Sequence, residues 1–103
     1  MAYRLVVTER AEELVDNIVY HLLYRLKSEQ AAIHLMDEIE KVYSRLEENP
    51  LQFPLCRDYY LASRGYHEAV LSGMSYIMVF NITGESVNIV GIFHQLENYQ
   101  RKL

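Results

Sequence analysis

The 103-residue sequence has a single cysteine and no long hydrophobic run. Cys56 has no second cysteine to pair with, which excludes an internal disulfide and a zinc site built from several thiolates. The apolar runs are far shorter than the roughly 20 residues that a membrane-spanning helix needs. The first residues carry charges within their apolar run, unlike a secretory signal peptide. We therefore expect a protein of the reducing cytoplasm, with no membrane segment, no metal site and no cofactor.

Basic residues are also scarce, because the sequence has no lysine or arginine between Gly65 and Gln100. Residues 1–50 hold 10 acidic and 6 basic residues, residues 51–103 hold 4 of each, and the chain has a net charge of -4. Nucleic-acid affinity depends largely on cations that neutralise phosphates. The charge distribution therefore argues against strong, autonomous binding of nucleic acid.

Hydrophobic periodicity predicts a short strand and two helices in the first half of the chain. Residues 3–7 alternate as a strand does. Thr8 is a good N-cap for a helix over about residues 9–27, whose apolar residues recur at helical spacing. Ser28 caps a second helix, which Asn49-Pro50 ends. The short link between the two helices predicts an antiparallel hairpin.

The second half of the sequence predicts β-structure. Its runs are rich in valine, isoleucine, tyrosine and phenylalanine, and glycines stand between them, which is typical of β-hairpins. The predicted strands cover residues 66–71, 74–82 and 87–94, after a loop over 49–63 and before a tail or one or two helical turns over 96–103.

The order β-α-α-β-β-β predicts one α+β domain over residues 1–103. Neither helix can bury its apolar stripe alone, so we expect the helical hairpin to pack on one face of an antiparallel sheet. Any chemistry is then expected on the open face of that sheet.

Several groups of residues, in this order along the chain, are typical of one superfamily. They are Met1-Ala2-Tyr3, Glu9-Arg10-Ala11, Leu46 followed by Pro50, Gly65-Tyr66, the run from Tyr76 to Phe80, Ile92 with His94, and Glu97-Asn98-Tyr99. In this combination the chain resembles toxins of the RelE/ParE superfamily over nearly its whole length.

The resemblance implies a growth inhibitor of a bacterial type II toxin-antitoxin system, of the kind associated with plasmid stabilisation and stress response. A cognate antitoxin would neutralise it. The expected assembly is a toxin-antitoxin hetero-oligomer or a homodimer of the toxin. RelE-like members cut mRNA on the ribosome, and ParE-like members inhibit DNA gyrase. The chain departs from RelE-like members where they carry basic residues, which here are Ile77, Gly91, Leu96 and Glu97. This departure favours a ParE-like binder of a protein target.

The alternative is a metal-independent, ribosome-dependent endoribonuclease. Its candidate catalytic residues are His67, His94, Tyr99 and Arg64. Histidine titrates near neutral pH and can act as acid or base. An arginine can contact phosphate, and a tyrosine can stack on a base. His21 and His34 do not have the spacing of a metal-binding pair.

Aromatic residues on a surface with few charges favour contact with protein. Tyr59, Tyr60 and Glu68 are therefore the candidate residues for binding the antitoxin or the target. Three functions stay open from the sequence: a toxin that binds a protein target, a nuclease with a reduced site, and a degenerate toxin that only binds its antitoxin.

Overall fold

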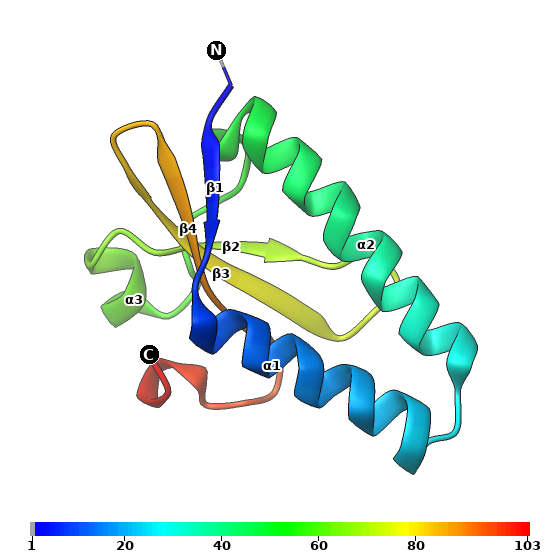
Figure 1. Ribbon diagram of the computed structural model, residues 1–103. Helices are drawn as coiled ribbons and strands as arrows, with labels where there is room; N and C mark the ends of the chain where they lie inside the picture. Colours follow the sequence, from blue (N-terminus) through cyan, green and yellow to red (C-terminus); the bar gives the residue numbers. More distant parts are fainter. Residues whose placement is uncertain (1) are drawn as a thin grey trace.

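The computed structural model describes residues 2–103 (Figure 1), so Met1, where the family resemblance begins, lies outside the described residues. The main elements follow the predicted order β-α-α-β-β-β, with short helical segments added. The strands are β1 (Arg4–Val7), β2 (His67–Val70), β3 (Tyr76–Thr83) and β4 (Ser86–His94). The helices are α1 (Glu9–Tyr20), α2 (Glu29–Glu48) and α3 (Tyr59–Ser63), with the shorter turns η1 (His21–Arg25), η2 (Pro50–Gln52) and η3 (Tyr99–Arg101).

Both long helices begin at the capping residues that the sequence indicates. The Thr8 hydroxyl accepts a hydrogen bond from the Ala11 amide at 3.1 Å and donates one to the Ile89 carbonyl at 2.9 Å. It therefore caps α1 and also joins the start of that helix to β4. Ser28 accepts only from the Ala31 amide, at 3.2 Å, and acts as a simple N-cap for α2.

The first helix changes form before it ends. α1 is α-helical to Tyr20 and continues as the wider π-helical turn η1, so the helix predicted to residue 27 stops at Arg25. Lys27, at a φ of 51°, then reverses the chain into α2. No helix in residues 2–103 combines the length and the apolar character that a membrane crossing requires.

The sheet has the strand order β1-β4-β3-β2. β2, β3 and β4 pair antiparallel, and Gly84, at a φ of 60°, supplies the left-handed residue of the tight β3–β4 turn. The expectation of a purely antiparallel sheet is wrong for β1, which pairs parallel with β4. Parallel neighbours need a long crossover, and here the helical hairpin, β2 and β3 all intervene in sequence.

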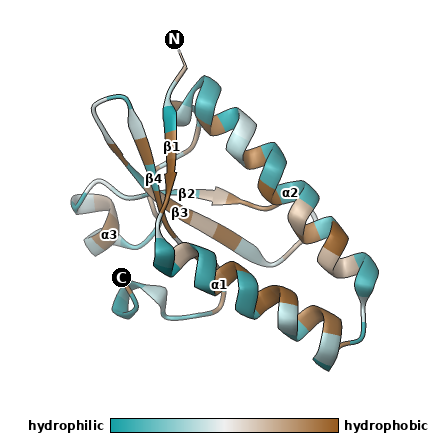
Figure 2. Cartoon of the chain, in the orientation of Figure 1, coloured by the Kyte–Doolittle hydropathy of each residue, from teal (hydrophilic) through white to brown (hydrophobic). Residues whose placement is uncertain are grey.

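The helical hairpin covers one face of the sheet, as predicted. Figure 1 shows α1 and α2 on one side of the strands, and Figure 2 shows hydrophobic residues along β3 and alternating with hydrophilic ones on both helices. The apolar side chains of α2 pack on the sheet in one main core. Its fully buried members include Leu35, Leu46, Leu71, Met78, Phe80, Val87, Ile89 and Ile92.

The opposite face of the sheet, which was expected to be open, is also covered. The segment expected to be a loop over 49–63 contains η2 and α3, and the C-terminal segment contains η3. Side chains from α3 and η3 pack on the outer faces of β3 and β4. The sheet is therefore buried on both sides at its centre.

We predict that Thr8→Ala lowers the free energy of unfolding by about 2 kcal/mol, because a cap and a hydrogen bond to β4 are lost together. Ser28→Ala should lower it by about 1 kcal/mol, because only a cap is lost. Urea titrations followed by circular dichroism would measure both values. Thr8→Ser should stay close to wild type, and equal losses for the two alanine variants would contradict the tie between α1 and β4.

Candidate functional site: the second face of the sheet

The face of the sheet opposite the helical hairpin is filled by apolar side chains. They come from the segment before α3, from α3, from β3 and β4, and from η3. Tyr99 stacks on Phe93 with 5.4 Å between ring centroids and 13° between ring planes. This second-face cluster consists of Cys56, Leu61, Ile77, Val79, Phe93 and Tyr99. The expected open working face is therefore a second, smaller core.

Positions 77 and 91, which lack the arginines of RelE-like toxins, lie within this packing. Ile77 is fully buried. A Cβ atom added to Gly91 would lie 2.5 Å from Cε2 of Phe93, so the phenylalanine ring occupies the space of any side chain there. The packing of this face therefore leaves no space for cationic side chains at these two positions.

Glu68 is buried beside the cluster, with only 4% of its surface exposed. One carboxylate oxygen accepts a hydrogen bond from the Arg57 amide at 2.9 Å, and the other lies 3.2 Å from Nε of Arg57. The pair fastens the segment before α3 to β2. The sequence indicates no role for Arg57, because it is 11 positions from Glu68 and no local spacing marks such a pair.

Burial and charge also make the polar groups of this cluster unreactive. Burial, with the nearby Glu68 carboxylate second, raises the pKa of the Tyr99 hydroxyl to about 12. The same two causes raise the pKa of the Cys56 thiol to about 12. Both groups therefore stay protonated at neutral pH, as structural side chains do.

His67 lies on the other face of the sheet, toward the helical hairpin. Its ring stacks on Phe80 with 5.2 Å between centroids. Its Nδ1 lies 3.1 Å from the carbonyl oxygen of Phe53, and since a carbonyl only accepts, Nδ1 carries the proton. This contact fastens η2 to β2.

His94 ends β4 and organises the C-terminal turn. Its Nδ1 accepts a hydrogen bond from the Leu96 amide at 3.1 Å, and its own amide donates to Glu97 at 2.9 Å. His67 pairs with Phe80 and His94 with Tyr76, so the histidines lie two strands and four residues apart. That is about 10 Å across and roughly 13 Å along the strands, too far to act on one phosphate.

The remaining candidate residues form a separate patch on α3. The side chains of Tyr59 and Tyr60 are 87% and 56% exposed, and the Arg64 guanidinium lies 5.5 Å from the centre of the Tyr60 ring. These three residues, which we call the α3 surface, lie on the side of the sheet opposite α1 and α2 (Figure 1). The structure thus brings Tyr59, Tyr60 and Arg64 together. It places Glu68 near Tyr99 and separates both histidines from these two groups.

The sequence matches the model of one family. The family model described as ParE toxin of type II toxin-antitoxin system, parDE, matches residues 5–99. A structure titled as the chromosomal ParDE toxin-antitoxin system of P. aeruginosa is similar, with a TM-score of 0.69 and 18% identity over 90% of this chain and 96% of that one.

A second similar structure is the toxin-antitoxin complex RelBE2 of Mycobacterium tuberculosis. It aligns with a TM-score of 0.59 and 23% identity, over 91% of this chain and 99% of that one. At these identities the two structures support the fold alone. No curated protein matches the sequence.

We predict that Gly91→Arg lowers the free energy of unfolding by about 1–3 kcal/mol, because the new side chain displaces the Phe93 ring. Phe93→Ala alone should cost about 3–5 kcal/mol. The double variant should cost less than the sum of the two, since removing the ring frees the space. Urea unfolding of the wild type, the two single variants and the double variant measures this coupling. Strictly additive losses in the free energy of unfolding would contradict the steric overlap between a side chain at position 91 and the Phe93 ring.

We also predict that iodoacetamide at pH 8 modifies Cys56 at least 100-fold more slowly in the folded protein than in guanidinium chloride. A thiol with a pKa of about 12 is almost never a thiolate at that pH, and only the thiolate reacts. Mass spectrometry of timed samples follows the reaction. Rapid labelling of the folded protein would show a reactive thiol instead.

Proposed function

Because this chain belongs to the ParE toxin family of type II toxin-antitoxin systems, we propose that it arrests growth by binding a protein target, with DNA gyrase as the first candidate. A cognate antitoxin neutralises it. Both similar structures come from toxin-antitoxin systems, which supports this partner. In this proposal the protein acts in the bacterial cytoplasm, as a single toxin domain in a hetero-oligomer with its antitoxin.

The packing of the second face is the observation that favours protein binding over RNA cleavage as the function. Cleaving RNA through its own 2′-hydroxyl needs a base, an acid and cations that stabilise the phosphorane. On this face phenylalanine, isoleucine and tyrosine side chains fill the space instead. Arg57, whose positive charge acts on Tyr99 of this cluster, is paired with Glu68.

The α3 surface is our candidate for the contact with the target. Tyrosine and arginine are enriched among the residues that dominate the energy of protein interfaces. Tyr59 and Tyr60 are fixed on one short helix, which Asp58 caps through the Leu61 amide at 2.9 Å. Leu61 anchors that helix in the second-face cluster, so the tyrosines are held outward on a rigid base.

A ribosome-dependent endoribonuclease is the second candidate, and one observation favours it. Glu97 accepts hydrogen bonds from the His94 amide and from Lys102, which gathers an imidazole, a carboxylate and an ammonium at the C-terminal turn. Tyr76 meets His94 edge to face at 5.6 Å. These groups could supply a reduced acid-base site if the ribosome positioned the RNA.

We predict that Tyr59→Ala/Tyr60→Ala reduces inhibition of gyrase supercoiling at least tenfold and abolishes growth arrest. The reason is that two exposed aromatic anchors are lost while the cores stay intact. Tyr20→Ala/Tyr24→Ala is the matched control, because those tyrosines are 61% and 66% exposed on the helical hairpin. The control should inhibit within twofold of wild type in purified gyrase assays.

Bacterial cultures that express the wild type and these variants distinguish the three candidate functions. Arrest with intact mRNA and an SOS response fits the proposal. Early loss of translation with cut mRNA, removed by His94→Ala but not by the tyrosine variants, would replace the proposal with the nuclease. Absence of any growth arrest would leave a protein that only binds its antitoxin.

A further inference from the structure

Two uncommon backbone conformations adjoin at the end of the helical hairpin. In the π-helical turn η1 the Leu26 amide donates to the His21 carbonyl, five residues back, at 3.0 Å. The next residue, Lys27, has a φ of 51°, and it is the only non-glycine residue among residues 2–103 with a positive φ. A lysine is strained in this conformation, whereas a glycine is not. Strained and π-helical segments are enriched at functional sites, so this end of the hairpin is a candidate for one.

The π-helical turn separates buried leucines from exposed aromatic residues. Leu22 is buried in the main core, and Leu23 packs partly against it. Tyr20, Tyr24 and Leu26 are instead 61%, 66% and 60% exposed. The ring centroids of the two tyrosines are 4.8 Å apart, so the rings form one aromatic pair. None of these three exposed side chains lines the hollows between α1 and α2, so they form a separate surface.

Positive charge accompanies this exposed apolar surface. Arg25 and Lys27 are both exposed, and neither takes part in the three salt bridges among residues 2–103. The sequence from Asn17 to Ser28 contains no acidic residue, although residues 1–50 contain 10. The end of an otherwise acidic hairpin is therefore cationic. We define the hairpin tip as Tyr20, Tyr24, Arg25, Leu26 and Lys27.

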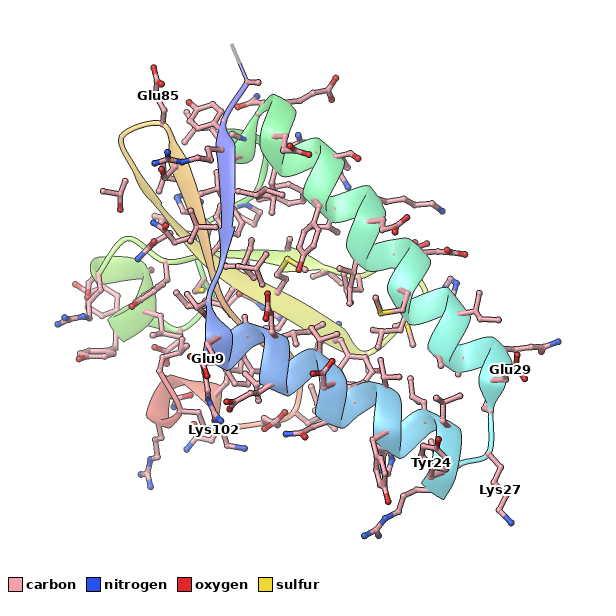
Figure 3. The ribbon with its side chains drawn as sticks, in the orientation of Figure 1. Glu9, Tyr24, Lys27, Glu29, Glu85 and Lys102 are labelled. Atoms are coloured by element: carbon pink, nitrogen blue, oxygen red, sulfur yellow. The ribbon has the colours of Figure 1, made fainter. Side chains whose placement is uncertain are left out.

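The hairpin tip lies where a large partner can reach it. Figure 1 shows that the connection between α1 and α2 lies beyond the ends of the strands. Figure 3 shows Tyr24 and Lys27 at the opposite end of the molecule from Glu85 in the β3–β4 turn, with Lys27 extending outward. The tip is also remote from the α3 surface, which lies on the other side of the sheet (Figure 1).

Stability does not account for the residues of the tip. A glycine at position 27 would remove the backbone strain. Polar residues in place of the exposed tyrosines would leave the main core unchanged. Binding does account for these residues, because tyrosine and arginine are enriched among the side chains that dominate the energy of protein interfaces.

We propose that the hairpin tip binds an acidic segment of a partner protein. Carboxylates of the segment pair with Arg25 and Lys27, and an apolar side chain between them covers Leu26 and the tyrosine pair. This inference does not depend on the proposed function, because the contact with the target uses the α3 surface.

Charge and composition favour an acidic protein segment over the other anionic partners. Nucleic acid is disfavoured, because the tip has only two cations and the chain has a net charge of -4. An anionic membrane is disfavoured, because attraction to such a surface takes a cluster of about 4–8 basic residues. A second copy could offer only its acidic helix faces to the tip. Such a head-to-tail contact does not close and would continue into chains of molecules.

The first test uses three fluorescent peptides of about 12 residues. One combines glutamates with leucines, the second has glutamine for each glutamate, and the third has serine for each leucine. Fluorescence anisotropy should show at least tenfold tighter binding of the glutamate-leucine peptide than of either control, weakening as NaCl rises from about 50 to 500 mM. Equal binding of either control peptide would overturn the proposal.

The same titrations include the competing partners. A single-stranded RNA of similar length and vesicles of phosphatidylglycerol and phosphatidylcholine should bind at least tenfold more weakly than the glutamate-leucine peptide. Tighter binding of the RNA or the vesicles would replace the acidic protein segment as the occupant. Sedimentation velocity measures self-association, and concentration-dependent chains of the protein alone would assign the tip to a second copy instead.

The second test locates the binding. Arg25→Glu/Lys27→Glu reverses both charges of the tip and should weaken the glutamate-leucine peptide at least tenfold. Arg10→Glu/Arg101→Glu makes the same change of net charge at exposed positions at the start of α1 and in η3, and should change binding less than threefold. Circular dichroism verifies that both variants are folded. Equal weakening by the two pairs would refute the assignment to the tip.

The third test separates binding from stability. Lys27→Gly should raise the melting temperature, because glycine adopts a φ of 51° without strain, and should weaken the peptide at least threefold, because a charge is lost. Tyr20→Ala/Tyr24→Ala should weaken the peptide at least tenfold. Unchanged affinity in both variants would refute the inference and leave the proposed function standing. Failure of the wild type to inhibit gyrase, with the peptide results as expected, would refute the proposed function alone.

Discussion

The pairing of β3 with β4 is the interaction on which the rest of the structure depends. Ile77, Met78, Val79 and Phe80 are consecutive residues of β3, and all four are fully buried. Alternate side chains of a strand point to opposite faces, so this strand is buried on both sides. β1 pairs with β4 and β2 with β3. The helices α1 and α2 cover one face of the sheet, and α3 and η3 cover the other.

This double burial decides where function can lie. A strand that is dry on both faces has no room for a cluster of hydrated cations, since an unpaired buried charge costs several kcal/mol. The polar and aromatic side chains that partners can reach are therefore at the periphery. Two such places are the α3 surface and the exposed faces of α1 and α2, which lie on opposite sides of the sheet (Figure 1). Acidic residues such as Glu12, Asp16 and Glu40 are exposed on the two helices, so the molecule has an aromatic surface on one side and acidic residues on the other.

Sequence reasoning succeeded where the determinants are local. The caps Thr8 and Ser28, the Gly84 turn and the apolar stripe of α2 each depend on residues a few positions apart. It failed where a contact joins distant segments. The parallel pairing of β1 with β4 and the bond from Arg57 to Glu68 leave no periodic pattern in the sequence. α3 was missed because five residues between turns are too short for a periodic signal.

The parallel pairing of β1 with β4 also has a consequence for the order of folding. Arg4 pairs with Ser86, and the two positions are 82 residues apart in sequence number. Contacts of such separation carry a high cost in loop-closure entropy, so they form late. During synthesis β1 leaves the ribosome before the other three strands, yet it has no partner strand until β4 has emerged. A translation product that stops before β4 therefore lacks a complete sheet, and of the four strands the first to be made is the last to be paired.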